Sequence, residues 1–202
     1  MLPLIEKANE IDLILASGSP RRKEILQQLG FKFKVETRPI DEVYPEHLVK
    51  TEISDFLAEQ KAKAFEDIPS NTIVITGDTI VWHNNKALGK PTDYREAVEM
   101  LESLSGQTHE VISSISIKTK QTITTVHETT QVSFKKLDEH EIAHYINTYL
   151  PYDKAGAYGI QEWIGQIGIT KIEGSFYNVM GFPTRVFYEA LKEVINQSFI
   201  SK

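Results

Sequence analysis

The sequence predicts an α/β fold with a mixed sheet, and three features of the chain support this class. Short apolar runs that are typical of buried strands alternate with segments whose apolar residues recur at helical spacing. Two long segments, residues 109–118 and 122–135, instead alternate between apolar and polar residues, which is typical of an antiparallel hairpin. The composition, with 41% hydrophobic and 25% charged residues, is that of an ordinary globular protein. Parallel-type strands beside a long hairpin favour a mixed sheet over a purely parallel one.

The first half of the chain has clear boundaries between its predicted elements. Residues 11–16 form an apolar run that predicts a buried strand. Ser19 is a suitable N-cap for the helix that follows, Pro20 fits its first position, and Gly30 marks its end. The run 72–76 predicts another strand, which we expect to stop at the glycine and aspartate that follow it. The remaining elements are a strand over 31–37, a helix over 54–65, an extended segment over 79–82 and a hairpin turn at Asn84-Asn85.

In the second half of the chain, residues typical of helix starts and helix ends also mark the boundaries of the predicted elements. Asp93 caps a helix that ends at Gly106, and Asp138 with Glu141 forms a capping box for a helix that stops before Pro151. The segments that follow are a glycine-rich polar loop over 153–161, a strand over 167–172 and a closing helix over 183–195.

Composition limits the classes of function. The net charge of -6 argues against a sequence-independent nucleic-acid binder, which needs a basic surface. The absence of cysteine excludes disulfides, thiolate metal sites and a cysteine nucleophile. No segment approaches the roughly 18 apolar residues of a membrane span, and the first twelve residues lack the apolar region of a signal peptide. We therefore expect one domain over residues 1–202 that is cytoplasmic and binds neither nucleic acid nor membrane.

The first turn of the helix after Ser19 is basic, which is unusual for a helix start. Arg21, Arg22 and Lys23 lie where the helix dipole disfavours cations by about 0.3–1 kcal/mol each. Backbone N–H groups, the hydroxyls of Ser17 and Ser19 and two guanidinium groups would together form a phosphate cradle. The alternative is a solvated basic turn that the next residue, a glutamate, partly neutralises.

Five segments carry a resemblance to a known family, and they occur in the order found in that family. They are LASGSPRR at 15–22, TGDTIV at 76–81, LGKP at 88–91, LSGQTH at 104–109 and DKAGAYGIQ at 153–161. The chain thus resembles the Maf family over nearly its whole length. This resemblance implies an elongated mixed sheet with flanking helices that form two lobes around a cleft, as in the inosine triphosphate pyrophosphatases. It also implies hydrolysis of a nucleoside triphosphate between the α and β phosphates, a divalent cation (Mg²⁺ or Mn²⁺) as cofactor, and a homodimer.

Two carboxylates are candidates for the chemistry. Asp78 follows the run 72–76, so we expect it at the carboxyl end of a strand, where ligands of α/β sheets bind. An aspartate after glycine is by itself more often a turn residue, but the resemblance implies that Asp78 is the general base and a metal ligand. Glu42 matches an acidic family position that binds the metal, with Asp41 as the substitute. Without the resemblance, both would be read as solvated acids.

Two lysines match family positions that face the phosphates. Lys61 lies on the helix predicted over 54–65, and Lys63, two residues later, should face away from it. Lys90 is held in an extended conformation by the proline that follows. Without the resemblance, each would be read as a surface lysine.

The loop 153–161 is the candidate for base recognition. Gln161 can both donate and accept hydrogen bonds, so it could bind the edge of uracil or thymine, and Lys154 could contact phosphate. Tyr158 could pack beside the base or be a buried structural residue. Arg21, Thr79 and Gln161 match positions that set substrate choice in the family, and the loop resembles the branch that acts on dTTP and UTP.

Two departures from the family pattern bear on this hypothesis. Gly77 stands where many members have alanine, and Glu162-Trp163 follows Gln161 where members commonly have glycine. The predicted reaction is attack of a water, activated by Asp78, on the α phosphorus of dTTP or UTP. Two alternatives remain: a 7-methyl-GTP pyrophosphatase of the same family, and a nucleotide-binding regulator of septum formation.

Overall fold

The computed structural model describes residues 3–199. The chain divides into two compact units, each built from separate segments of the sequence. Unit 1 comprises the residues up to Asp78, Ser113–Glu128 and the residues from Gly181 on, and unit 2 comprises Thr79–Ile112 and Thr129–Met180. Every helix within the described range is too short or too polar to serve as a membrane span.

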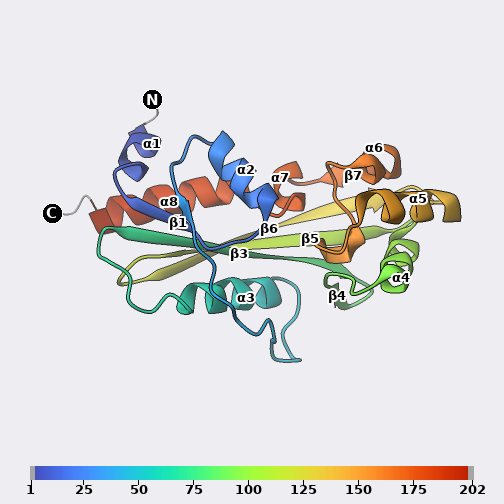
Figure 1. Cartoon of the computed structure of the whole chain (residues 1–202), viewed down its shortest axis with the longest axis horizontal. Helices are drawn as coiled ribbons and strands as arrows, with labels where there is room; N and C mark the ends of the chain where they lie inside the picture. Colours follow the sequence, from blue (N-terminus) through green and yellow to red (C-terminus); the bar gives the residue numbers. More distant parts are fainter. Residues whose placement is uncertain (1–2, 200–202) are drawn as a thin grey trace. The chain divides into compact units, whose positions relative to one another are not determined.

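The strands form a mixed sheet, which confirms the predicted class (Figure 1). Their hydrogen-bonded order is β2-β1-β3-β5-β6-β7, with β4 paired to β3. Strand β1 is parallel to both β2 and β3, whereas β3 with β4 and β6 with β7 are antiparallel. The strands are β1 Asp12–Leu15, β2 Lys34–Val35, β3 Thr72–His83, β4 Lys86–Leu88, β5 Thr108–Lys118, β6 Ile123–Phe134 and β7 Ile169–Glu173.

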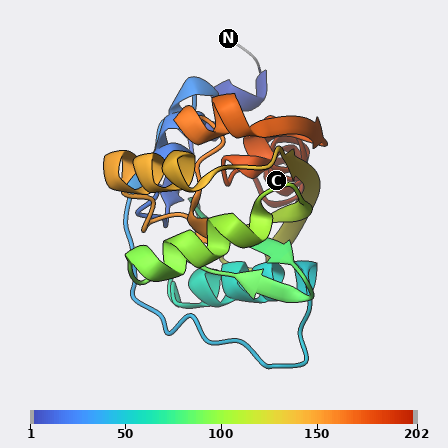
Figure 2. The same ribbon diagram turned by 90° about the vertical axis from the view of Figure 1, so that its right-hand side faces the viewer.

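Unit 1 has helices on both faces of its part of the sheet. Helix α3 lies on one face, and α2 and α8 lie on the other, in both views (Figure 1, Figure 2). Leu13 and Leu15 are buried, and Val74 packs with Phe65 in a second cluster, so the apolar residues of both strands are covered by the helices. The helices are α1 Pro3–Ala8, α2 Pro20–Gln28, α3 Thr51–Lys63 and α8 Thr184–Phe199.

Unit 2 packs its helices around a separate hydrophobic core. Leu101 of α4, Ile146 of α5 and Ile164 of α6 belong to this core. The capping box of Asp138 and Glu141 is present at the start of α5, as predicted. The helices are α4 Tyr94–Leu104, α5 Glu139–Tyr149, the 3-10 helix η1 Ala155–Ala157, α6 Trp163–Gly168 and α7 Phe176–Val179.

Several predicted boundaries are wrong. The strand expected over 31–37 comprises only Lys34–Val35, and the helix expected over 54–65 is Thr51–Lys63. Strand β3 does not stop at Gly77 but continues from Thr72 to His83, so Asp78 lies within a strand and not at its end. The glycine does not break the strand because it lies against β5, where an added Cβ would come within 2.7 Å of Ile115 Cδ1. The strand expected over 167–172 begins only at Ile169, because α6 extends to Gly168.

Candidate active site

The turn between β1 and α2 has the local hydrogen bonds of a capped helix start. The hydroxyl of Ser19, the N-cap, accepts a hydrogen bond from the backbone N–H of Arg22 at 3.4 Å. The hydroxyl of Ser17 accepts one from the backbone N–H of Ser19 at 3.2 Å. Pro20 is the first residue of α2, and Arg21 follows in the first turn. The N-terminus of a helix favours a bound anion, because its free N–H groups and its dipole attract negative charge. The geometry of this turn is therefore compatible with the predicted phosphate site.

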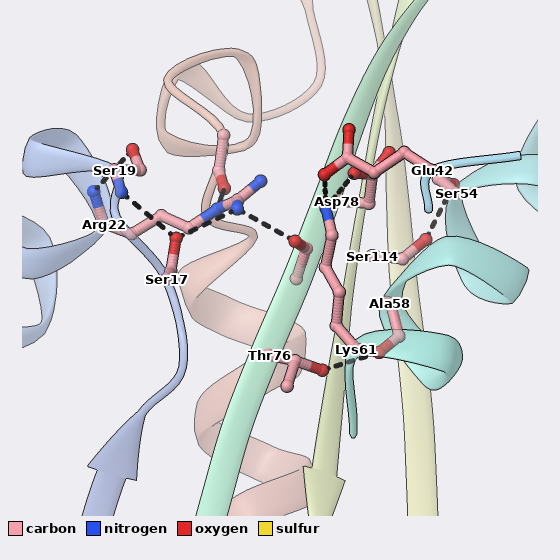
Figure 3. A network of polar contacts seen from close by, with 12 residues as sticks. Ser17, Ser19, Arg22, Glu42, Ser54, Ala58, Lys61, Thr76, Asp78 and Ser114 are labelled. Atoms are coloured by element: carbon pink, nitrogen blue, oxygen red, sulfur yellow. Dashed lines mark hydrogen bonds and ion pairs between the residues drawn. The ribbon is translucent and has the colours of Figure 1, made fainter. Parts of the chain in front are cut away.

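Arg22 directs its guanidinium group at the backbone of its own unit (Figure 3). Nε donates to the carbonyl oxygen of Gly181 at 2.9 Å, and Nη1 donates to that of Gly77 at 2.9 Å. Strand β1 ends at Leu15, and the last bond of this ladder runs from Ala16 N to the Ile75 carbonyl. The carbonyl of Gly77, two residues after Ile75, points towards β1 as the Ile75 carbonyl does, but β1 has already ended there. Arg22 donates the hydrogen bond that a β1 residue would otherwise provide. Burial lowers the pKa of Arg22, and Asp78 is the largest opposing influence.

Three charged side chains meet on the other side of β3 (Figure 3). Lys61 Nζ of α3 lies 2.7 Å from Asp78 Oδ1 and 2.8 Å from Glu42 Oε1. The side chains of Asp78 and Lys61 are 11% and 18% exposed, whereas that of Glu42 is 49% exposed. The structure therefore brings together the predicted base, the predicted metal ligand and one predicted phosphate lysine.

The environment of Asp78 raises its pKa above the ordinary value of 3.8. Burial is the main cause, because it disfavours the charged form, and nearby Glu42 adds to it. The charge and hydrogen bond of Lys61 and the charge of Arg22 act in the opposite direction. No residue in the described range donates a hydrogen bond to Oδ2 of Asp78. A carboxylate with one oxygen held and the other open, and with a raised pKa, is suited to accept a proton from water.

Helix α3, which carries Lys61, is attached to the sheet by buried polar contacts. Thr76 Oγ1 donates to the Ala58 carbonyl at 2.7 Å, one turn before Lys61. Ser114 of β5 donates to Ser54 of α3 at 2.7 Å. Thr76 and Asp78 are two residues apart on one strand and so face the same way. These contacts fix the helix register that brings Lys61 to Asp78.

The donor set of Glu42 and Asp78 fits a divalent cation that the substrate also coordinates. Both carboxylates contact the same ammonium nitrogen, so their oxygens are directed at one region. The described residues contain no group of three or more side chains that could hold a metal by themselves. Mg²⁺ is commonly bound by one or two carboxylates together with phosphate oxygens and water. The two side chains could therefore hold such an ion when a triphosphate is bound.

Unit 2 contains the predicted site residues Thr79, Lys90, Lys154 and Gln161. A backbone hydrogen bond connects the segment of Lys90 with the loop of Lys154 and Gln161. The backbone N–H of Gly156 donates to the carbonyl of Gly89 at 3.0 Å, which places the loop 153–161 beside the residue before Lys90. Gly156 has a φ of +68° and lies against Val81, where an added Cβ would come within 2.9 Å of Cγ2. Only glycine fits this contact and this backbone conformation. Val81 is two residues after Thr79 on β3.

The side chains of this loop have unequal surroundings. Lys154 is buried, and its ammonium group lies 2.6 Å from Asp153 and 3.1 Å from Glu162. Tyr158 is buried and shares a 2.7 Å hydrogen bond with His109, so it is a core residue in this structure. The side-chain oxygen of Gln161 is buried and has no hydrogen-bond partner within the described range.

Several residues that shape these clusters were not predicted from the sequence. The Gly181 carbonyl is 159 positions from Arg22 in the chain, and no local pattern indicates that contact. Thr76 could have been found, because strand alternation places it on the face of Asp78. Glu162 was noted only as a departure from the family pattern, although it is the partner of Lys154.

Comparison with known proteins gives a consistent set of relatives. A family model described as Maf, Maf-like protein, matches residues 12–194. A "dTTP/UTP pyrophosphatase" of Christiangramia forsetii is 51% identical over 197 residues, which cover 97% of this chain and 100% of the relative. Proteins of the same name from Flavobacterium johnsoniae and Bacteroides fragilis are 50% and 46% identical, each over 95% of this chain and 100% of the relative.

One solved structure is a remote match. A HAM1 protein from Coxiella burnetii has a TM-score of 0.47 and 14% sequence identity, over 91% of this chain and 99% of that chain.

Proposed function

This chain belongs to the Maf family, and from that premise we propose that it hydrolyses dTTP and UTP to the nucleoside monophosphate and pyrophosphate. Relatives that are named for this activity are about half identical to the chain over their whole length. The observation that carries the proposal is Asp78, a buried carboxylate on β3 with a raised pKa, one oxygen held by Lys61 and the other open to a ligand.

The residues of unit 1 perform the chemistry in this proposal. Asp78 Oδ2 accepts a proton from the water that attacks the α phosphorus. Lys61 holds the carboxylate in place and offers positive charge to the phosphates. The start of α2, with Ser17, Ser19 and Arg21, binds phosphate oxygens. Arg22, which we predicted as a phosphate ligand, holds the Gly77 carbonyl next to Asp78 and adds positive charge nearby.

A divalent cation, Mg²⁺ or Mn²⁺, completes the proposal, with Glu42 and Asp78 as its protein ligands. When bound, such an ion neutralises the negative charge that develops on the departing pyrophosphate. Glu42 and Asp78 are hard oxygen donors of the kind that these ions prefer.

Residues of unit 2 have the roles that the family resemblance implies. We propose that Lys90 and Lys154 contribute positive charge to phosphate binding, and that Thr79 and Gln161 select the base. Gln161 suits this role because its buried side-chain oxygen has no partner in the described part of the chain, so a ring N–H of uracil or thymine can supply one. A cytoplasmic location and a homodimer also stay predictions.

The test is pyrophosphate release from a panel of dTTP, UTP, CTP, dGTP and 7-methyl-GTP, with Mg²⁺, with Mn²⁺ and with a chelator. We expect release from dTTP and UTP that is lost in the chelator. Preference for 7-methyl-GTP would leave the proposed pyrophosphatase reaction in place but contradict the proposed choice of uracil and thymine nucleotides. Binding of nucleotides without release of pyrophosphate would refute the enzymatic function.

A further inference from the structure

The loop of residues 153–162 in unit 2 is closed by an ion pair between its two ends. Lys154 Nζ lies 3.1 Å from Glu162 Oε1, and their side chains are 9% and 18% exposed. Asp153 is a second partner of Lys154 at 2.6 Å, but its side chain is 53% exposed. Water screens the exposed pair more than the buried one. Glu162 is therefore the partner that fixes the ammonium group within the protein.

The same carboxylate also attaches the loop to α5. Tyr145 of α5 donates its hydroxyl hydrogen to Glu162 Oε2. The Tyr145 oxygen in turn accepts a hydrogen bond from the backbone N–H of Gly159 at 3.0 Å. Burial, followed by the hydrogen bond and charge of Glu162, raises the pKa of Tyr145, so the phenol keeps its proton. One carboxylate thus controls the start, the middle and the end of the loop.

Position 159 has no space for a side chain beside the Glu162–Lys154 pair. A Cβ added at Gly159 would come within 2.8 Å of Glu162 Cδ and 3.1 Å of Lys154 Cε. The backbone of the loop therefore lies directly under the Glu162–Lys154 pair. The backbone N–H of Glu162 donates to the Gly159 carbonyl at 3.0 Å, which makes a tight turn around residues 160 and 161.

Gln161 lies inside this turn, immediately before Glu162. Its buried side-chain oxygen can accept a hydrogen bond from a ligand. Uracil and thymine carry an N–H at ring position 3, whereas cytosine carries an acceptor nitrogen there. A glutamine oxygen held in a fixed position would accept from the first two bases and repel the third.

We infer that Glu162 is a positioning residue for base selection, which acts by holding the loop that carries Gln161. This inference rests on the proposed function and deepens it, because it assigns discrimination of uracil and thymine from cytosine to a residue outside the predicted site. Glu162 does not touch the base. Its carboxylate holds Lys154 and Tyr145 in place, and Tyr145 in turn holds the backbone of Gly159. These contacts fix the turn over residues 159–162 and with it the position of Gln161.

The test compares UTP with CTP in the wild type, Glu162→Gln and Tyr145→Phe. The amide of the first variant has nearly the same shape but lacks the charge that holds Lys154. Glu128→Gln is the matched control, because Glu128 is partly buried and forms an ion pair of the same 3.1 Å length with Arg185 in unit 1. Steady-state kcat and KM are measured from pyrophosphate release, and folding is checked by thermal melting.

For Glu162→Gln, we expect the KM for UTP to rise about tenfold and kcat to stay within about threefold, as for loss of one well-placed hydrogen bond. The ratio of kcat/KM for UTP to that for CTP should fall by the same factor. Tyr145→Phe should lower this ratio by about threefold, and Glu128→Gln should leave it unchanged.

An unchanged ratio in Glu162→Gln, with UTP still hydrolysed, would overturn this inference alone. Equal loss of kcat for both nucleotides would also overturn it, since that indicates a purely structural role. If Glu162→Gln does not fold, Tyr145→Phe decides by the same ratio. A folded wild type that hydrolyses neither nucleotide would refute the proposed function and this inference together.

Discussion

Two clusters in this protein have the same composition, a lysine between two carboxylates, but differ in how the carboxylates are used. In unit 1, Lys61 lies between Glu42 and Asp78. In unit 2, Lys154 lies between Asp153 and Glu162. Each cluster pairs its lysine with one exposed and one largely buried carboxylate. Residue types alone therefore do not distinguish the cluster that we propose to be catalytic from the one that holds a loop in place.

The second oxygen of the buried carboxylate distinguishes them. Both oxygens of Glu162 are occupied, one by Lys154 and one by the hydroxyl of Tyr145. Only one oxygen of Asp78 has a donor from residues 3–199. A fully bonded carboxylate stabilises its surroundings, whereas one with an open oxygen keeps capacity for a ligand or a proton.

The largest effect is expected for Asp78→Asn, which removes the proposed proton acceptor. We expect kcat to fall by about 10³-fold or more, measured as pyrophosphate release from UTP. Because burial holds the pKa of Asp78 above 3.8, the ionised carboxylate costs folding free energy as the pH rises above that value. In chelator at neutral pH, the variant should therefore melt no lower than the wild type.

The control for this experiment is Asp67→Asn, at an exposed position of the same unit. It should change neither activity nor melting temperature. Full activity in Asp78→Asn would show that the open oxygen is not the base, and the comparison of the two clusters would lose its main support.

The next effect concerns Lys61→Met, which leaves Asp78 in place but removes its partner. We expect kcat/KM to fall by about 10²–10³-fold, as for loss of one charge that stabilises the transition state. Lys63→Met is the matched control, since Lys63 is on the same helix and forms an exposed pair with Glu59. Equal effects at the two positions would contradict the assignment.

For Lys154→Met, the main effect should be on stability, because Glu162 would keep a buried charge without its counter-ion. Such losses cost about 2–3 kcal/mol at a partly buried pair, which corresponds to about 5–10 °C in melting temperature for a chain of this size. Lys171→Met, which removes an exposed pair with Glu173, should shift melting by less than about 2 °C. A melting temperature no lower than that of this control would show that the cluster of unit 2 is not structural.

The smallest effect is expected for Glu42→Gln. The side chain is half exposed, so its ion pair contributes little to stability. As a proposed metal ligand, however, its loss should raise the Mg²⁺ concentration for half-maximal activity by about tenfold. Titration of activity with Mg²⁺ measures this, with Glu46→Gln in the same loop as control. An unchanged titration would exclude Glu42 as a ligand.

Features that depend on neighbouring residues could be predicted from the sequence. Ser19, Asp93 and Asp138 each cap a helix as expected, because each side chain accepts from a backbone N–H three residues later. The same reasoning, with the family resemblance, indicated Asp78, Lys61 and Glu42 as site residues, and the structure brings these three together. The assigned roles of the site residues remain predictions.

Features that depend on packing between distant segments could not be predicted. A glycine before Asp78 indicates a strand end by local propensity, yet β3 continues because β5 lies against Gly77. From the basic first turn of α2, the sequence predicts Arg21 and Arg22 as phosphate ligands, but it does not predict the backbone contacts of Arg22. The bonds of Arg22 to Gly77 and Gly181 depend on segments that are far away in the sequence.

The close approach at Gly77 also couples two distant positions of the sequence. An alanine at position 77 would place its Cβ 2.7 Å from Ile115 Cδ1 and 2.9 Å from the Ser114 carbonyl oxygen. The first contact is with the end of a flexible side chain, so another rotamer or a shorter side chain at position 115 relieves it. The second contact is with the backbone of β5, so it needs a small separation of the two strands. The side chain that position 115 can carry therefore depends on which residue stands at position 77.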